Sequence, residues 1–402
     1  RDWNQFYAGL PDGSFSDNRI DECFETHYAD FWHASAAGPN GCSGEWSTKQ
    51  FKGAVVRDFD GDGLPDVLTC AYADRGFQDQ DCLEYAVQWI ENGTRGVFLF
   101  HNQSEPGRIH FVECAASAFG SDIHGNTAEY WNPYQAAPLD YDRDGDLDLF
   151  IGATIRKNLE TGFTEDTPAV RFFENISTPG SPKFVDRTRE AGFAWINDLP
   201  AGERRGYRMA AAVQADIDND GHMDLIAVNR ADPDKTEAAY TLVFRNNGDR
   251  TFTEIAPQQH GLSHGAGGRD ISSGDFNSDG LIDLMINDGD AGGYEGADNS
   301  RVYLNRTPSL HHWLQLEVRD AQTGTFVIGA RVTVYDTSGQ ILGYQEYRTD
   351  FSYRSKRYPR LHFGLGQTEV VDLEVIDNNK QIHRFNGIAC DQLEILTIQL
   401  ET

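Results

Sequence analysis

The 402-residue chain has few basic residues for its size and no long apolar run. It holds 34 Lys and Arg against 63 Asp and Glu, a formal charge of −29 at pH 7, which argues against a nucleic-acid partner. No stretch approaches the roughly 18 to 20 apolar residues that a membrane-spanning helix needs. Nucleophile elbows, phosphate-binding glycine loops and zinc signatures are also missing, so no common catalytic motif identifies an enzyme.

Cysteine is scarce, and none of the six residues stands in a C-x-x-C pair. This spacing argues against zinc ribbons and thioredoxin-like chemistry, whereas an even number favours disulfides. The sequence begins at Arg1 without Met or a signal peptide, so we expect a mature exported chain that is secreted, or periplasmic in a bacterium. The sequence does not choose among the pairings, one set of which joins Cys23 to Cys42, Cys70 to Cys82, and Cys114 to Cys390.

What the chain has in abundance is a nine-residue acidic loop, present in four copies. Positions one, three, five and nine supply side-chain oxygens, position six is always Gly, and position seven is expected to offer its carbonyl. A hard cation takes about six to eight oxygens, and alternate residues of a tight loop can turn theirs inward together. Gly at position six permits the positive φ that such a turn requires. The copies read Asp58-Phe-Asp-Gly-Asp-Gly-Leu-Pro-Asp66, Asp140-Tyr-Asp-Arg-Asp-Gly-Asp-Leu-Asp148, Asp216-Ile-Asp-Asn-Asp-Gly-His-Met-Asp224 and Asp275-Phe-Asn-Ser-Asp-Gly-Leu-Ile-Asp283.

The loops therefore predict about four Ca²⁺ sites. An EF-hand is excluded because it needs Glu at position twelve, where this chain has Thr69, Ile151, Ala227 and Ile286. A solvated turn is an equal alternative for any single copy, but four copies in register favour metal binding. The expected metal ligands are Asp58, Asp60, Asp62, Leu64, Asp66, Asp140, Asp142, Asp144, Asp146, Asp148, Asp216, Asp218, Asp220, His222, Asp224, Asp275, Asn277, Asp279, Leu281 and Asp283.

Each loop leads into a short apolar run of strand length, so each is expected to join two strands of a β-hairpin. A third strand ending in Asn follows at residues 97–102, 171–175, 242–246 and 302–305, and three of the copies add a fourth strand with a Phe. Four strands in each unit are typical of a β-propeller blade. Loop-to-loop spacings of 82, 76 and 59 residues require insertions, which we place at residues 73–95, 154–168 and 230–238.

The sequence thus predicts an all-β fold with three parts. Residues 53–309 form a calcium-binding β-propeller of at least four blades. Residues 1–52 precede it, and residues 6–10 within them resemble the closing segment of a blade. Residues 310–402 lack the loops but contain alternating strands at 313–318, 330–335, 370–375 and 393–398, which predict a second all-β domain, a β-sandwich or extra blades.

Two groups of residues carry a resemblance to known families. The acidic repeats resemble the FG-GAP and VCBS blades of integrin-type propellers. Residues 328–334 (Ile-Gly-Ala-Arg-Val-Thr-Val) and 360–366 (Arg-Leu-His-Phe-Gly-Leu-Gly) resemble the ASPIC/UnbV domain. One departure is the stretch Ile376-Asp-Asn-Asn379, where such domains usually carry a Trp-Pro-Ser-Gly-like turn. The resemblance implies secretion, calcium binding and extracellular contacts, with no catalytic residues to transfer.

Three functions remain open at this stage, since fold alone does not decide function. The leading hypothesis is a calcium-rigidified extracellular recognition scaffold, expected to be monomeric, whose partner is a protein, a glycan or a small polar ligand. The alternatives are a carbohydrate-binding lectin and an enzyme, a lyase, isomerase or cyclase, with its pocket on the propeller axis. The segments before the inner strands are expected to converge there and to place ligand-binding side chains, namely His124, Arg205, Tyr207, His264 and Arg269.

Asn-x-Ser/Thr sequons mark the chain as a candidate glycoprotein. They occur at Asn92, Asn102, Asn175 and Asn305. The last three fall at the same place in the repeat as Asn246, which is not in a sequon, so an Asn is favoured there for a turn in any case.

Overall fold

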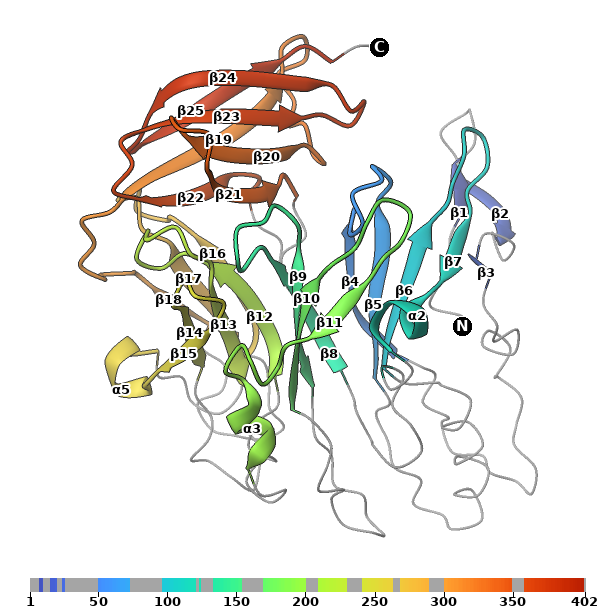
Figure 1. The fold of residues 1–402 in the computed structure, drawn as a ribbon, viewed down its shortest axis with the longest axis horizontal. Helices are drawn as coiled ribbons and strands as arrows, with labels where there is room; N and C mark the ends of the chain where they lie inside the picture. The colour runs from blue at the N-terminus through green and yellow to red at the C-terminus, as the bar shows by residue number, and fades with distance from the viewer. Residues whose placement is uncertain are drawn as a thin grey trace.

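The fold is that of a computed structural model, drawn in Figure 1. It describes residues 7–9, 15–19, 24–25, 50–72, 96–120, 123, 133–153, 169–199, 209–229, 241–262, 268–288, 300–348 and 358–400. Strands dominate this part of the chain, which confirms the all-β prediction. The short helices among them are α2 (Ala115–Phe119), α3 (Ala194–Asp198) and α5 (Pro257–His260).

Four antiparallel sheets follow one another along the chain, and each contains one acidic loop between its first two strands. The first contains β4 (Gln50–Arg57), β5 (Asp66–Tyr72), β6 (Gly96–Asn102) and β7 (Phe111–Glu113). The second contains β8 (Pro133–Leu139), β9 (Asp148–Ala153), β10 (Val170–Asn175) and β11 (Phe184–Asp186).

The third and fourth sheets repeat the pattern. The third contains β12 (Met209–Ala215), β13 (Asp224–Asn229), β14 (Leu242–Asn246) and β15 (Phe252–Ile255). The fourth contains β16 (Gly268–Gly274), β17 (Asp283–Asp288) and β18 (Arg301–Tyr303). These bounds confirm the predicted hairpins, the third strands and the fourth strands. The insertions at 73–95 and 154–168, and all of 230–238, lie outside the described residues.

The sheets stack face to face as an arc, because both faces of their strands are apolar. The inner strands contact one another in the order β4, β8, β12, β16. On β10, Phe172 packs toward the third sheet while its neighbour Phe173 packs toward the first, as the alternation of a strand requires. Val213 of the third sheet and Ile271 of the fourth belong to the core between those two sheets. Within the described ranges no closed ring is seen.

The C-terminal unit is a two-layer sandwich. One sheet contains β19 (His312–Asp320), β22 (Leu361–Gly366) and β25 (Gln392–Ile398), with β19 and β25 parallel. The other contains β20 (Arg331–Asp336), β21 (Ile341–Glu346), β23 (Val370–Ile376) and β24 (Ile382–Ala389). Leu316, Val332 and Leu373 belong to the one core between them. Strands β21, β22 and β24 were not among those predicted.

The N-terminal segment adds a strand to a blade-like sheet, although not through residues 6–10. Residues 7–9 form β1 (Tyr7–Gly9), which pairs with β2 (Phe15–Arg19) in a separate two-stranded sheet. It is β3 (Phe24–Glu25) that extends a blade-like sheet, in parallel with β7. Backbone pairing, which sequence similarity to a closing segment does not encode, decides which strand joins the sheet.

The cysteine prediction also needs correction. Cys70, Cys114 and Cys390 are free thiols, so the proposed pairing of Cys114 with Cys390 and that of Cys70 with Cys82 are wrong here. Cys114 follows β7 in the first sheet, whereas Cys390 follows β24 and donates its thiol to the carbonyl of Thr368 at 3.1 Å. Cys23, Cys42 and Cys82 lie outside the described residues.

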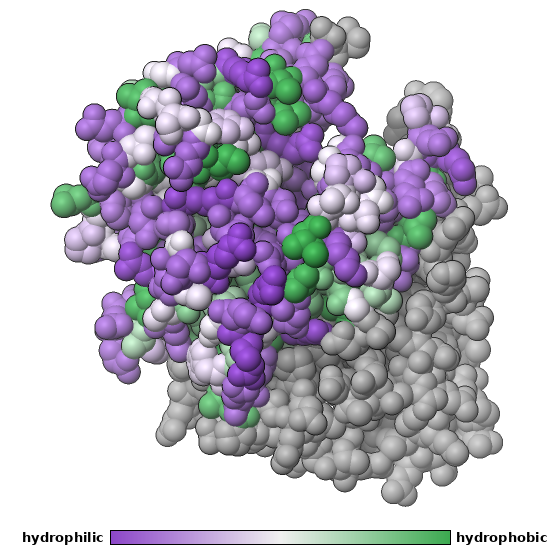
Figure 2. All heavy atoms as spheres, in the orientation of Figure 1, coloured by the Kyte–Doolittle hydropathy of each residue, from purple (hydrophilic) through white to green (hydrophobic). Residues whose placement is uncertain are grey.

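The C-terminal unit covers the end of the sheets at which the acidic loops lie (Figure 1). The described surface in Figure 2 is mainly hydrophilic, with small separate apolar groups, as the excess of acidic residues leads one to expect. No helix among the described residues is long and apolar enough to cross a bilayer.

Candidate metal centres

The four acidic loops share one backbone conformation. Gly63, Gly145, Gly221 and Gly280 at position six have φ between 85° and 93°, which confirms the reason for Gly there. Position four is left-handed as well, although only the first loop has Gly at it. Arg143, Asn219 and Ser278 adopt φ of 63°, 57° and 61° at this position. Such a conformation is uncommon outside Gly and Asn, so the loops hold it by their contacts.

The Asp at position nine fixes each loop to its own sheet. Its Oδ2 accepts the N–H of position two at 2.8 to 3.1 Å. Its Oδ1 accepts the N–H of the Asn that ends the third strand at 2.7 to 2.8 Å. The residues concerned are Asp66, Asp148, Asp224 and Asp283. These carboxylates therefore anchor the loop and keep only their remaining lone pairs for a cation.

The Asn that ends a third strand also joins neighbouring sheets. Its side-chain amide donates to the position-two carbonyl of the preceding loop. The bonds are Asn175 to Phe59 at 2.8 Å, Asn246 to Tyr141 at 2.9 Å and Asn305 to Ile217 at 2.7 Å. Asn175 is 2% exposed and Asn102 is 6% exposed. A glycan on Asn175 would have to displace this bond, so we expect that sequon to stay unmodified; Asn92 lies outside the described residues.

The second loop gathers the most acidic ligand set, and Asp140 and Asp148 within it are buried. Oxygens of Asp140, Asp142 and Asp148 lie within 4.8 Å of one another. Both oxygens of Asp140 and Oδ1 of Asp146 are buried and receive no hydrogen bond of good geometry. Burial, reinforced by neighbouring carboxylates, raises the pKa of Asp140 and that of Asp146 to about 8. Buried oxygens that repel one another and lack donors fit a divalent cation.

The third loop has the same core and, like the second loop, where Arg250 lies 2.9 Å from Asp142, it has a built-in cation beside it. Asp216, Asp218 and Asp224 place oxygens within 4.8 Å of one another, and burial raises the pKa of Asp216 well above its usual range. Arg245 on β14 lies 2.7 Å from Asp218 and 3.3 Å from Asp220, a neutralising contact that the sequence did not reveal. This loop therefore retains part of its charge balance when no ion is bound.

The fourth loop is the most exposed. The amide of Asn277 donates to Asp279 at 2.8 Å, and Gln315 of the C-terminal unit donates to Asp275 at 2.9 Å. Phe276 at position two is 50% exposed, whereas Tyr141 at the same place is 3% exposed. With its oxygens already bonded and in contact with water, this loop has less to gain from a cation.

The first loop has partners that no other loop has. His101 on β6 places Nε2 3.1 Å from Oδ2 of Asp60 and 3.6 Å from Oδ2 of Asp62. Arg331 of the C-terminal unit binds Oδ2 of Asp58 at 2.7 Å. Burial raises the pKa of Asp58 to about 6 although Arg331 opposes the shift. Local sequence patterns do not indicate Arg331 as a partner, because it lies 273 residues away. His101 stands in a strand, outside the loop motif that predicts the ligands.

The C-terminal unit reaches all four loops, and its two signature motifs provide several of the contacts. Arg331 comes from the first motif. In the second, His362 binds the side chain of Asn219 at 2.8 Å, and a Cβ on Gly364 would overlap a carboxylate oxygen of Asp216. Lys380, next to the atypical turn at 376–379, donates to the carbonyl of Asp62 at 2.8 Å. The motifs therefore form the face that lies on the loops.

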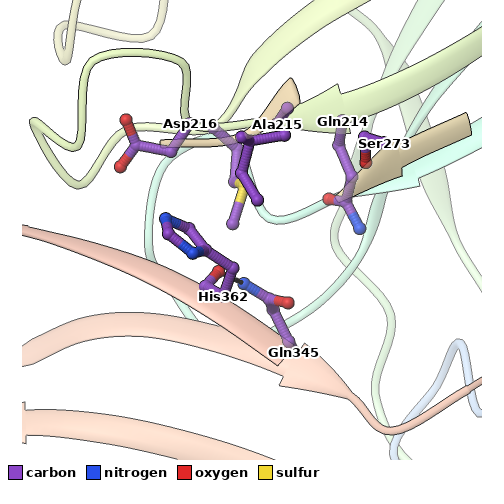
Figure 3. A pocket seen from close by; sticks show the side chains of 8 residues that line it. Gln214, Ala215, Asp216, Ser273, Gln345 and His362 are labelled. Atoms are coloured by element: carbon purple, nitrogen blue, oxygen red, sulfur yellow. Dashed lines mark hydrogen bonds between the residues drawn. The ribbon is translucent and has the colours of Figure 1, made fainter. Parts of the chain in front are cut away.

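A small cavity lies between the sheets and this face. Figure 3 shows Gln214, Asp216 and Ser273 opposite Gln345 and His362. Its volume of about 10 Å³ holds no more than one water molecule. No ligand pocket is therefore built here. Of the predicted axial residues, His124, Arg205, Tyr207 and His264 lie outside the described residues, and Arg269 lies in β16 with its side chain undescribed.

Comparison with known proteins agrees with these two parts. A model of the FG-GAP-like repeat matches residues 216–286, and one described as ASPIC and UnbV matches residues 320–401. The chain carries an FG-GAP-like repeat and an ASPIC/UnbV domain. The family resemblance read from the sequence is thus confirmed, and the ASPIC/UnbV match contains both signature motifs.

Similarity to curated proteins extends over most of the chain. Cartilage acidic protein 1 of Homo sapiens is 27% identical over 311 residues, which are 76% of this chain and 41% of that protein. The Mus musculus protein of the same name is 27% identical over 318 residues, 77% and 42% of the two chains. The FG-GAP and ASPIC/UnbV chain thus spans about two fifths of the length of these relatives. A pilus 2b backbone protein of group B streptococcus matches at 11% identity and a TM-score of 0.16, over 66% of this chain and 96% of that one. This likeness is too low to indicate a shared fold.

Proposed function

We propose that this protein is a secreted calcium-binding β-propeller that serves as an extracellular interaction scaffold. In this proposal the acidic loops bind divalent cations, Ca²⁺ in those with oxygen ligands alone, at the end of the propeller that the ASPIC/UnbV domain covers. The cations offset the repulsion among carboxylates, and the rigid assembly presents its surface to an extracellular protein or glycan.

The observation that carries the calcium proposal is the second loop. Its buried carboxylate oxygens on Asp140 and Asp146 receive no hydrogen bond of good geometry, and leaving charged groups in that state is costly. A hard cation supplies what the loop lacks, since Asp140, Asp142 and Asp148 already converge. The same backbone recurs in the other three loops, which supports a repeated site.

Extracellular placement is supported by the relatives. Cartilage acidic protein 1 is named for a tissue that consists largely of extracellular matrix, and for an acidic character that this chain shares with its charge of −29. An acidic surface with little apolar area suits contacts with polar matrix components.

Two measurements test the proposal. Differential scanning fluorimetry should give a higher melting temperature in millimolar CaCl₂ than in chelator, and no difference would contradict calcium binding. Surface plasmon resonance against purified matrix proteins and glycans, run in calcium and then in chelator, should show binding that depends on calcium. Binding to none of them would contradict the scaffold role while leaving the metal sites intact.

A further inference from the structure

One register position distinguishes the four loops from each other. It is the residue that precedes the Asn at the end of each third strand, namely His101, Glu174, Arg245 and Leu304. His101 and Arg245 face equivalent carboxylates, those at positions three and five of their own loops. A guanidinium there is a permanent cation that needs no metal. An imidazole there is a potential metal ligand.

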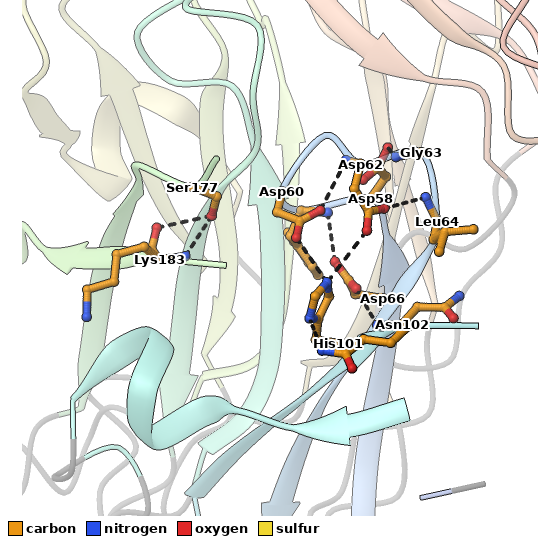
Figure 4. A network of polar contacts seen from close by, with 12 residues as sticks. Asp58, Asp60, Asp62, Gly63, Leu64, Asp66, His101, Asn102, Ser177 and Lys183 are labelled. Carbon is orange, nitrogen blue, oxygen red and sulfur yellow. Dashed lines mark hydrogen bonds and ion pairs between the residues drawn. The ribbon is translucent and has the colours of Figure 1, made fainter. Parts of the chain in front are cut away.

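The imidazole of His101 is buried against the first loop (Figure 4). His101 is 5% exposed and Asp60 is 4% exposed. Nε2 of His101 and Oδ2 of Asp60 lie 3.1 Å apart, and neither atom makes a hydrogen bond of good geometry. Ligand atoms of His101, Asp60 and Asp62 all lie within 4.8 Å of one another. Two buried atoms of this kind, aimed at each other, can be satisfied together by one ion.

The other ring nitrogen of His101, Nδ1, already has a polar neighbour. Nδ1 of His101 lies 3.3 Å from the side-chain amide of Gln103. A 180° rotation of that amide would put its oxygen at the same place. This oxygen would then accept the Nδ1–H, which fixes the tautomer that leaves Nε2 available to a metal.

The donor set favours a different ion from the other loops. Imidazole with carboxylates suits borderline divalent metals such as Zn²⁺, whereas Ca²⁺ prefers oxygen alone. One carboxylate oxygen is also taken up here by a permanent cation, because Arg331 binds Oδ2 of Asp58. Asp60, Asp62 and His101 are the residues whose ligand atoms converge, and further coordination positions are open beside them.

We propose that the first loop is a mixed nitrogen and oxygen site for a borderline divalent metal of the Zn²⁺ class, held by Asp60, Asp62 and His101. This inference rests on the proposed loop function only in that the remaining loops are the calcium sites. It assigns the two kinds of ion to different sheets of one propeller.

The test is zinc retention in excess calcium. The full chain is freed of metal, dialysed against ZnCl₂ with millimolar CaCl₂, and its zinc content measured by plasma mass spectrometry. The wild-type protein should retain one equivalent, and His101→Gln should bind it at least about tenfold more weakly. The matched control Arg245→Gln, changed at the same register position of the third sheet, should retain zinc as the wild type does.

A second measurement covers the case in which His101→Gln fails to fold. Wild-type crystals soaked in ZnCl₂ should give an anomalous peak between Asp60 and His101. A peak at Cys114 or Cys390 instead, no retained zinc, or equal retention in His101→Gln would overturn the proposal. The calcium-dependent melting shift of the same samples reports separately on the other loops, so the two proposals can fail independently.

Discussion

The second and fourth loops share one backbone conformation, but the second is more buried and the fourth is more exposed to water. Both hold left-handed residues at positions four and six and the same anchor from position nine. In the second loop, Asp140 and Asp146 carry buried oxygens that receive no hydrogen bond of good geometry. In the fourth, Asp275 and Asp279 receive amide donors from Gln315 and Asn277 and lie nearer water. Loops with the same backbone conformation would therefore gain to very different degrees from a bound cation.

The cause is the place of each loop in the arc. The second loop has another sheet behind it, so Asn246 reaches the Tyr141 carbonyl and the Tyr141 ring packs 4.9 Å from Phe172. The fourth loop ends the series of described sheets, and its Phe276 remains half exposed. Burial removes the water that would solvate charged oxygens, and so it sets the need for metal.

The largest expected effect is on local stability after metal removal. Calcium at about 100 times its Kd stabilises a site by about 2.7 kcal/mol. Hydrogen exchange measured by mass spectrometry in chelator and in calcium should show a greater loss of protection at residues 140–148 than at 275–283. Equal loss of protection at both segments would contradict the conclusion that the second loop gains more from calcium than the fourth.

Matched neutral substitutions at position one should act with opposite signs in chelator. Above about pH 8, where Asp140 is deprotonated, Asp140→Asn removes a buried charge, so it should raise the melting temperature of the metal-free protein while one bound ion is lost in calcium. Asp275→Asn removes an acceptor of Gly280 and Gln315, so it should lower that temperature slightly. Calorimetry with calcium counts the ions, and the same sign for both variants would refute the burial argument.

The side-chain bonds that Asn residues make between neighbouring sheets should also contribute less to stability at the exposed end of the arc. Asn246→Ala leaves the Tyr141 carbonyl buried without a donor and should cost about 1 to 3 kcal/mol in urea unfolding. Asn305→Ala removes the equivalent bond to Ile217 where water can enter, and should cost less. Both are compared in calcium with the exposed control Asn247→Ala. If Asn305→Ala lowers the free energy of unfolding more than Asn246→Ala does, the fourth sheet is not the less stable end of the arc.

The pH dependence of the metal-free protein should follow the second loop. The pKa of Asp140 and that of Asp146 are raised to about 8 by burial, from 3.8 in an unfolded chain. The folded state thus binds these protons more tightly, so their stabilisation is complete below about pH 4 and is lost as the pH rises toward 8. Urea unfolding in chelator should show this decline, and Asp140→Asn should reduce it. Calcium should remove the decline, because it binds the deprotonated carboxylates.

The sequence predicts the acidic loops and the strands beside them, but not the contacts that distinguish one loop from another. The spacing of Asp and Gly predicts the loops, because ligand geometry is local, and apolar runs predict the strands beside them. Left-handed Arg143 has no such signal, since its neighbours impose that conformation. The contact of Asp58 with Arg331 depends on how two domains pack, and local patterns carry no record of it.

The smallest expected effect comes from restoring the missing carboxylate of the fourth loop. Asn277→Asp adds a negative charge at position three and removes the amide that donates to Asp279. Both changes make the loop more like the second, so its calcium affinity should rise by a few-fold, while exposure to water keeps the gain small. Calcium titration by calorimetry should show the weakest step becoming tighter, and Ser278→Ala, next to it in the loop, serves as the control. If Asn277→Asp leaves the weakest step unchanged, another loop is the weakest and charge at position three does not set the order.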